Sequence, residues 1–557
     1  MDVNASIRRS VRGTVGLLLA LLALPAPMQA QSLTSGSLRG SVVDLTGEAV
    51  SGAEISLEDA RGALVRVIEA DFRGRFSVPL LPPGTYRLLV EQVGYQPVRY
   101  LNVIIAAGQA TSLTATLERR PPPIESVIER EATIAMASVA AGGLVSGSDL
   151  ALLGRRNDLG DLSRSQTELG GVHDGRDGLM ISGAGLPARW SRLFVDGVQE
   201  PLMRHPGLPA EPASAPAFAR EALDQAMILN RAADNEWRGT PGSLIAAQSR
   251  RGSGAFGFSP YVTYSGSSLG GAAADNPADS SASSLQIGGS LSGAMIPDTL
   301  SVYFRADYQR LQQPTALPWV RDGVGAPDPD TQLPGSLRTL VTTAALDNFG
   351  TNVSRFVQPT LRTWQGFSAL GRLDWRLASS TQLMVRASGA SWEERSPQVG
   401  NDLMSGAGVE LEGQDISGMV GVTTSGQRSA NELRVGVSTA KRTWTAPQAL
   451  AATTLASEGA GFGIGSEFPA AFSVTTIDIS DAFQIAWDRH QVKFGVSAAL
   501  RSHRQTYAWG TGGRWHFGNV DRFGAGEGDW MQVTNTGQAE FGTTEVGIFV
   551  QDAWQVS

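Results

Sequence analysis

The sequence contains no cysteine, almost no lysine, and no hydrophobic run long enough to cross a bilayer as a helix. The absence of cysteine excludes disulfides, thiolate metal sites, iron–sulfur clusters and cysteine nucleophiles. Stability must therefore come from burial and from closed sheets. The formal net charge of −8 argues against a nucleic-acid partner.

The motifs of common catalytic and metal sites are also missing. The sequence has no His-Glu-x-x-His, no P-loop and no acidic residues at calcium-loop spacing. Gly266 to Gly270 spells a nucleophile elbow and Gly252 to Gly257 a dinucleotide fingerprint, but neither opens the helix that its motif requires. The histidines stand in no metal-binding spacing: His173, His205, His490, His503 and His516. We therefore expect no enzyme, no catalytic residue, no cofactor and no metal.

The N-terminus has the pattern of a secretory signal peptide, which we assign to residues 1–30. Arg8, Arg9 and Arg12 precede an apolar stretch from Val15 to Leu24, and a small-residue stop follows at Ala30. This stretch is far shorter than the roughly twenty residues that span a hydrocarbon core. The sequence predicts an exported protein.

Residues 31–120 are predicted to form a compact β-sandwich. Short runs rich in β-branched residues are separated by turn residues, which is the spacing of a small sandwich. The expected strands are Leu38 to Asp44, Ala53 to Glu58, Ala63 to Ala70, Arg75 to Val78, Thr85 to Gln92, Val98 to Ile105 and Thr111 to Leu117.

Several blocks of this module resemble the carboxypeptidase regulatory-like domain, a transthyretin-like sandwich with a carbohydrate-binding-like fold. The blocks are Gly40 to Gly47, Val50 to Ala53, Asp71 to Phe76, Leu81 to Tyr86 and Val93 to Tyr95, in that order. The resemblance implies a non-catalytic appendage.

Residues 121–135 are predicted to be a linker, because Pro121, Pro122 and Pro123 favour an extended spacer. The residues directly after the prolines resemble the short extended box by which TonB-dependent receptors are gripped from the periplasm. This candidate box consists of Ile124, Glu125, Ser126, Val127 and Ile128, which a partner could add as an edge strand. The alternative is an ordinary linker with apolar residues.

Residues 136–252 resemble the plug of a TonB-dependent receptor, an α+β domain. Two phrases carry the resemblance, Leu179 to Gly183 and Leu193 to Val198; they look like the plug's strand pair, in which Asp-Gly makes a hairpin turn. The candidate plug-motif residues are Ile181, Gly183, Val195, Asp196 and Gly197.

Three further features describe the expected plug. The segments Asn157 to Leu169 and Ala217 to Leu229 are predicted as helices from their apolar spacing. Gly239 to Gly254 resembles the plug's exit into the first barrel strand. The sequence departs from the family pattern at Ser182, where arginine is more usual, and at Ser249, where threonine is.

Residues 253–557 alternate apolar and polar residues with a period of two, which predicts the N-terminal part of an antiparallel transmembrane β-barrel. The best example sets Leu300, Val302, Phe304, Ala306 and Tyr308 against Ser301, Tyr303, Arg305, Asp307 and Gln309. The same split recurs around Leu373, Val435 and Phe494. The alternative is a soluble β-sandwich, whose strands also alternate.

The connections of this region have the asymmetry of an outer-membrane barrel. Long inserts such as Pro314 to Pro334 and Gly400 to Gly413 occur beside a tight connection at Asp488 to His490. An aromatic girdle would lie at Trp392, Trp444 and Trp487, although each could equally be a packing residue.

The predicted barrel is incomplete. Transporters of the family close with about 22 strands, and about half that number can be counted before Ser557. The final stretch, Glu545 to Trp554, resembles an internal barrel strand, so we expect a sequence truncated at its C-terminus.

Together these features resemble a TonB-dependent outer-membrane receptor for gated uptake. The resemblance implies location in the outer membrane of a Gram-negative-type bacterium and contact with its lipid. Its expected partners are an inner-membrane TonB-type energising complex, a small ligand or oligosaccharide, and a surface lipoprotein. A glycan is the first expectation for the ligand and a siderophore-like compound the second. The alternatives are a non-transporting surface adhesin or carbohydrate-binding protein and, less favoured, an exported hydrolase.

Overall fold

The structure is a computed structural model that consists mainly of β-strands. It describes residues 36–554 except 60–63, 82–83, 106–108, 121–126, 139–141, 147–171, 174–180, 183–191, 201–221, 230–243, 253, 267–282, 315–334, 354–360, 396–409, 427, 446–450, 458–459, 463–469, 488–489, 509 and 535–536. The signal peptide predicted for residues 1–30 lies outside this part. Among the described residues, no helix combines the length and the apolar character that a membrane span needs.

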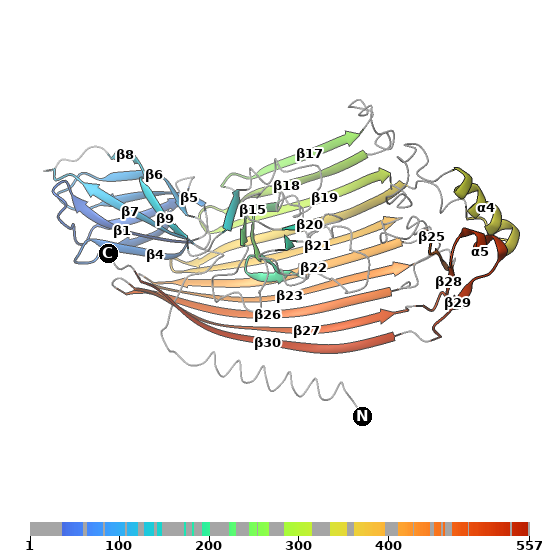
Figure 1. The fold of residues 1–557 in the computed structure, drawn as a ribbon. Coiled ribbons are helices and arrows are strands. Elements are labelled where there is room, and N and C mark those ends of the chain that lie inside the picture. The colour runs from blue at the N-terminus through green and yellow to red at the C-terminus, as the bar shows by residue number, and fades with distance from the viewer. Residues whose placement is uncertain are drawn as a thin grey trace.

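The N-terminal module is a two-sheet sandwich (Figure 1). Its strands are β1 (Gly36–Asp44), β2 (Glu54–Asp59), β3 (Leu64–Glu69), β4 (Arg75–Leu81), β5 (Gly84–Glu91), β6 (Val98–Ile105) and β7 (Gln109–Leu117), followed by β8 (Ile128–Glu131) and β9 (Ile134–Ser138). One sheet has the order β4-β1-β7-β9 and the other β3-β2-β5-β6-β8. The seven strands that the sequence predicts are therefore confirmed.

Alternation along these strands builds the core of the sandwich. Ile55 and Leu57 on β2 and Leu88 and Val90 on β5 are completely or almost completely buried, because every second side chain faces the other sheet. Of the two additional strands, β8 comes from the predicted linker and β9 crosses from the linker into the first residues predicted for the plug, and each extends a different sheet.

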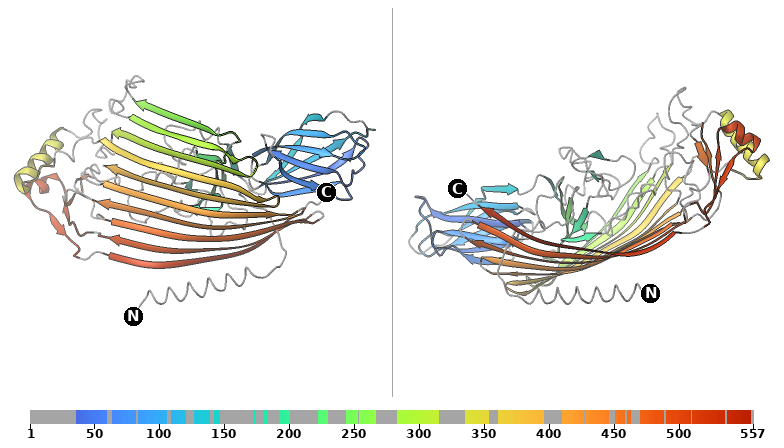
Figure 2. Two further views of the ribbon diagram at one scale, coloured as in Figure 1. Left: turned by 180° about the vertical axis from the view of Figure 1, so that it is seen from behind. Right: turned by 60° about the horizontal axis from the view of Figure 1, so that its bottom comes forward.

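A second unit lies against the concave side of the largest sheet (Figure 2), and we call it the plug. Its strands are β10 (Gly142–Ser146), β11 (Val172–His173), β12 (Ile181–Ser182), β13 (Arg192–Val195), β14 (Val198–Glu200), β15 (Leu223–Leu229) and β16 (Leu244–Ser249). Five of them form a sheet in the order β10-β15-β16-β13-β14.

Two expectations for the plug differ from the structure. The helix expected from Ala217 to Leu229 is wrong over Leu223–Leu229, which forms β15 with a neighbour on each side. Short apolar runs do not distinguish helix from buried strand, and sheet pairing overrides the helix preference of alanine and leucine. In addition, β12 pairs with β11 and β13 pairs with β14 and β16, so the described residues of the two plug phrases do not pair with each other. The other predicted helix lies outside the described residues.

The third unit is a ten-stranded antiparallel sheet that curves around the plug, and we call it the barrel wall (Figures 1 and 2). Its strands are β17 (Gly257–Gly266), β18 (Ser283–Ile296), β19 (Leu300–Pro314), β20 (Leu361–Ala378), β21 (Thr381–Arg395), β22 (Glu410–Ser425), β23 (Ser429–Thr445), β26 (Ala470–Trp487), β27 (His490–Tyr507) and β30 (Gly537–Trp554). Its two edge strands, β17 and β30, do not pair with each other within the described residues.

The two faces of the barrel wall differ as the sequence predicts. On β19, Phe304 is 48% exposed and Tyr308 38%, whereas Arg305 is 8% exposed and Asp307 4%. Apolar side chains thus cover the outer face, and charged side chains are buried on the inner face toward the plug. This arrangement is that of a lipid-facing and a lumen-facing surface.

Long and short connections lie at opposite ends of the wall. Strands β26 and β27 are joined by two residues, while long outer segments fold together beyond the other end (Figure 1). These segments contain α4 (Gly335–Phe349), α5 (Val520–Ala525), β24 (Ala452–Leu455), β25 (Ala460–Phe462), β28 (Arg514–Phe517) and β29 (Asp529–Met531). Phe349, Phe517 and Phe523 pack in their shared core, with ring centroids 5.0–5.9 Å apart.

The tryptophans expected in an aromatic girdle divide into two groups. Trp487 is 70% exposed, as a lipid-interface residue would be. Trp392 and Trp444 are buried, and their rings lie against Trp364 and Phe472 respectively. For Trp392 and Trp444 the packing alternative is therefore the correct one, because they belong to the inner face of their strands.

Candidate functional site: an ionic latch between plug and barrel wall

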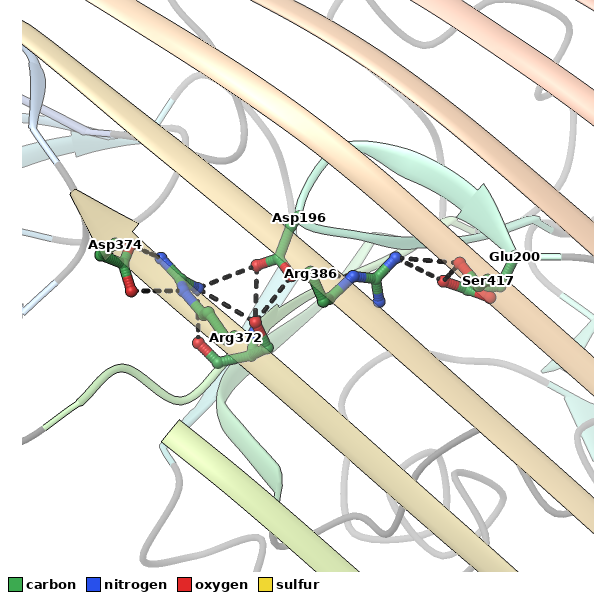
Figure 3. Close-up of polar contacts among 7 residues, drawn as sticks. Asp196, Glu200, Arg372, Asp374, Arg386 and Ser417 are labelled. Atoms are coloured by element: carbon green, nitrogen blue, oxygen red, sulfur yellow. Dashed lines mark hydrogen bonds and ion pairs between the residues drawn. The ribbon is translucent and has the colours of Figure 1, made fainter. Parts of the chain in front are cut away.

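The β13–β14 hairpin of the plug meets the barrel wall through charged groups. Asp196 and Gly197 form its turn with φ angles of 50° and 84°. Positive φ at both central residues is what a tight hairpin turn requires, and Asp-Gly is well suited to it. Because the turn is this short, Asp196 and Glu200 both reach the inner face of the wall (Figure 3).

Asp196 is surrounded by donors from three strands. Its carboxylate accepts hydrogen bonds from the Ser249 amide at 3.0 Å and from the Ser249 hydroxyl at 2.7 Å. On the wall side, Arg372 Nη1 lies 3.3 Å from Asp196 Oδ1 and Arg386 Nε lies 3.4 Å from Asp196 Oδ2. This carboxylate thus joins the end of β16 to strands β20 and β21.

Glu200 forms the second contact, at the end of β14. Arg386 Nη2 donates to Glu200 Oε1 at 2.7 Å, and the Ser417 hydroxyl on β22 donates to the same oxygen at 3.0 Å. The Arg386 side chain is fully buried. Its charge is therefore balanced by two carboxylates that both belong to the plug.

Arg372 differs from Arg386 because it also has a carboxylate partner on its own strand. Its Nη2 and Nε bind Asp374 at 2.7 and 2.9 Å, and its Nη1 donates to the Ser249 carbonyl at 2.8 Å (Figure 3). We call this group the ionic latch; it consists of Asp196, Glu200, Ser249, Arg372, Asp374, Arg386 and Ser417.

Close steric fit accompanies the charges. A Cβ atom built on Gly436 of β23 would lie 2.5 Å from Val198 Cγ1, and one built on Gly197 would lie 2.7 Å from the Arg434 guanidinium. The flexible end of Arg434 can move aside, but the branched Val198 side chain cannot. Glycine at position 436 therefore allows the hairpin to lie directly on the wall, where Arg501 also donates to Gln199 at 2.8 Å.

The electrostatics of the latch keep Asp196 ionised. Burial acts to raise its pKa, but Arg372, Arg386 and the Ser249 hydrogen bonds outweigh that effect and hold the pKa below the ordinary value of an aspartate. Charge-assisted hydrogen bonds of this kind are stronger than neutral ones. The arrangement can fasten one edge of the plug to the wall at neutral pH.

The structure describes some of the residues singled out from the sequence and not others. Ile124, Glu125, Ser126 and Gly183 lie outside the described residues, Val127 is exposed, and Ile128 begins β8. Ile181 belongs to β12, away from the hairpin. Val195 ends β13, and the predicted turn at Asp196 and Gly197 is present.

Sequence reasoning missed the wall side of the latch, Arg372 and Arg386. Both stand at inward positions of alternating strands, where the pattern predicts only polar side chains that face the lumen. The available signal was the spacing of Arg372 and Asp374, which places both charges on one face of a strand. Nothing in the sequence indicated that Asp196 would be their partner.

Two family profiles match this chain. The carboxypeptidase regulatory-like domain matches residues 37–118, and an outer membrane beta barrel domain matches residues 327–557. No curated protein matches the chain. The first match covers the sandwich and the second the barrel wall from α4 onward, so the expected regulatory-like domain and the expected outer-membrane barrel are both confirmed as domain families.

Solved structures of similar shape share little sequence with the chain. The outer membrane transporter YddB from Escherichia coli has a TM-score of 0.47 at 11% identity, covering 74% of this chain and 54% of that one. The siderophore receptor PirA from Acinetobacter baumannii has a TM-score of 0.48 at 14% identity, covering 75% and 54%. The copper transporter OprC has a TM-score of 0.44 at 12% identity, covering 75% and 53%. The chain thus spans about half the length of each.

Proposed function

We propose that this outer-membrane protein, which joins a carboxypeptidase regulatory-like domain to an outer-membrane barrel domain, works as a TonB-dependent receptor for gated uptake. The matched barrel domain places the chain in the outer membrane of a Gram-negative-type cell. The observation that carries the proposal is the ionic latch, because a domain seated against the lumen face and fastened by buried ion pairs is suited to block a pore until it is moved.

The order of strands in the plug supports a mechanism. The latched hairpin is at one edge of the sheet, and β10 is at the other edge, where the chain arrives from the candidate box. Among the strands of the plug, β10 would therefore be the first that a pull applied near Ile128 reaches, while the hairpin stays bound to the wall. In this proposal the plug opens from its β10 edge. A glycan or siderophore-like ligand bound at the outer loops then passes through this opening.

The outer membrane supplies no nucleotide, so the energy for this movement has to come from a partner. We propose that an inner-membrane TonB-type complex grips the candidate box. Val127, which is exposed, is the box residue whose side chain can be tested most directly.

The test is capture of the outer-membrane protein on the immobilised periplasmic domain of TonB. We expect the wild-type chain to be retained and Val127→Asp to reduce retention at least tenfold, because a charge would be introduced into an apolar strand. Val93→Asp is the matched control, since Val93 is exposed in a turn of the sandwich, and it should bind as the wild type does. Equal retention of the wild type, Val127→Asp and Val93→Asp would contradict the proposal. Failure to retain any of the three would contradict it too.

A growth assay tests transport itself. Deletion of the gene and deletion of the energising complex should produce the same growth defect on a panel of polysaccharides and ferric siderophores. A surface adhesin would instead bind glycans without TonB capture and without a nutrient-specific defect.

A further inference from the structure

Strand β8, which begins at Ile128, is bound to the sandwich. Strand β8 runs parallel to β6, with Val98 opposite Ile128 and Leu101 opposite Glu131. The amides of Ile128 and Ala132 donate to the carbonyls of Pro97 and Leu101, each at 3.0 Å.

Side chains reinforce this pairing on both faces of β8. Ile128 and Ala132 pack on the hydrophobic core of the sandwich. On the opposite face, Arg99 lies 3.5 Å from Glu129, and Asn102 Nδ2 donates to Glu131 Oε2 at 2.9 Å. Ile128, the last residue of the candidate box, is therefore held by backbone and apolar contacts, and Glu129 and Glu131 add polar contacts farther along β8.

The next strand continues the attachment on the other sheet. Strand β9 pairs antiparallel with β7, from Ile134 opposite Leu113 to Ser138 opposite Gln109. The chain thus crosses from one sheet of the sandwich to the other before it enters the plug at β10. One sheet pairs with β8 through β6, and the other pairs with β9 through β7.

Arg119 and Arg120, which precede the proline spacer, are also bound to the sandwich. The Arg120 amide donates to the Gly94 carbonyl at 3.0 Å, close to the Pro97 carbonyl that binds Ile128. Arg119 adds a hydrogen bond to the Tyr95 hydroxyl at 3.0 Å. Arg120 and Ile128 are therefore both fixed to the same module.

We propose that the regulatory-like sandwich is an intramolecular clamp for β8, which begins at Ile128, the last residue of the candidate box, and that a partner whose strand pairing extends to Ile128 must displace β8 from β6. This inference rests on the proposed function. The β8 edge that carries the amides of Ile128 and Ala132 is occupied by β6, and glutamates at 129 and 131 oppose the addition of another strand to the outer edge. Strand addition by a partner and docking on the sandwich therefore compete for the backbone of Ile128, the residue that the candidate box and β8 share.

A reversible lock tests the clamp. Arg99→Cys with Glu129→Cys places thiols on in-register neighbours of β6 and β8, in a chain with no other cysteine. The control pair is Glu54→Cys with Glu69→Cys, which are in-register neighbours on β2 and β3 of the same sheet. We expect both disulfides to form on oxidation without any partner.

The two locks should differ in capture by the immobilised TonB domain. Oxidation of the β6–β8 pair should lower retention about tenfold or more, because only the undocked fraction can bind, and reduction should restore it. Oxidation of the β2–β3 pair should leave retention unchanged. Formation of the β6–β8 disulfide with unchanged or higher retention would overturn the clamp.

A loosening variant acts in the opposite direction. Asn102→Gly removes the bond to Glu131, and glycine is compatible with the positive φ of 56° at this position. With Arg99→Ala it should raise retention several-fold and speed hydrogen exchange at the Ile128 and Ala132 amides of the full chain.

The two proposals fail in distinguishable ways. If the β6–β8 disulfide does not form and these amides exchange freely, the clamp is wrong whether or not TonB binds. If the β6–β8 disulfide forms and the Ile128 and Ala132 amides exchange slowly, but the TonB domain retains no variant, the TonB-dependent function is wrong. The proposed competition for β8 is then wrong as well.

Discussion

The two edges of the plug sheet are attached to the rest of the molecule by different kinds of interaction. The β13–β14 edge is held by buried side-chain charges, with Arg386 between Asp196 and Glu200. The β10 edge pairs with β15 through backbone bonds over five residues and continues into strands clamped on the sandwich.

The difference has a mechanical consequence. A buried ion pair resists until its charges separate, and the cost of leaving one charge unpaired in a dry site is large. A short pair of strands can separate one hydrogen bond at a time, each contributing about 1 kcal/mol. The molecule therefore has one edge suited to remain in place and one suited to move.

The largest expected effect comes from removing Arg386. Arg386→Met leaves Glu200 without its arginine and Asp196 with one fewer, which should destabilise the hairpin by about 3–5 kcal/mol. Faster hydrogen exchange at the Asp196 amide, which donates to the Ala247 carbonyl, would measure this loss. Adding Glu200→Gln should recover part of it. An unchanged exchange rate in Arg386→Met would show that charge does not hold this edge.

A smaller effect is expected from the steric part of the latch. Gly436→Ala places a Cβ atom 2.5 Å from Val198 Cγ1, and overpacking of this kind costs about 1–3 kcal/mol. Val198→Ala should relieve most of the clash, so the double variant should protect the hairpin better than Gly436→Ala alone. The same amide-exchange measurement applies, and a double variant no better than the single one would contradict the fit.

The sandwich and the latch show how far sequence alone could reach. Seven strands of the sandwich are predictable because each is short, alternates, and ends at turn residues such as Asp71 and Gly74, where Gly74 has a φ of 73°. The hairpin turn at Asp196 and Gly197 is predictable for the same reason, since its conformation depends on those two residues.

What could not be predicted depends on contacts distant in sequence. Leu223–Leu229 carries a helix-compatible pattern and becomes a strand because β10 and β16 flank it. Arg386 and Glu200 are separated by 186 positions, and no local pattern links them. The docking of β8 on β6 likewise needs the folded edge of the sandwich, which a proline-rich linker does not reveal.

The pH response of the latch should be confined to strongly acidic conditions. The pKa of Asp196 is lower in the folded plug than in the unfolded chain. Its stabilisation is therefore complete above about pH 4, the ordinary range for aspartate, and is lost as the pH falls through the depressed folded value. Hairpin protection should be constant from about pH 8 to about pH 5. A loss near pH 6 would mean that another group controls this edge.

The smallest effect is expected at the clamp, where Arg99→Ala removes a partly exposed ion pair with Glu129 and should cost less than about 1 kcal/mol. The dependence on salt distinguishes the clamp from the latch. At about 1 M salt the Debye length is about 3 Å, so an exposed pair is largely screened while a buried one is screened much less. Added salt should therefore reduce the exchange difference between wild type and Arg99→Ala at the Ala132 amide, and leave the Arg386→Met difference at the Asp196 amide nearly unchanged. Equal salt sensitivity at both amides would mean that the latch is open to water and that both edges are held alike.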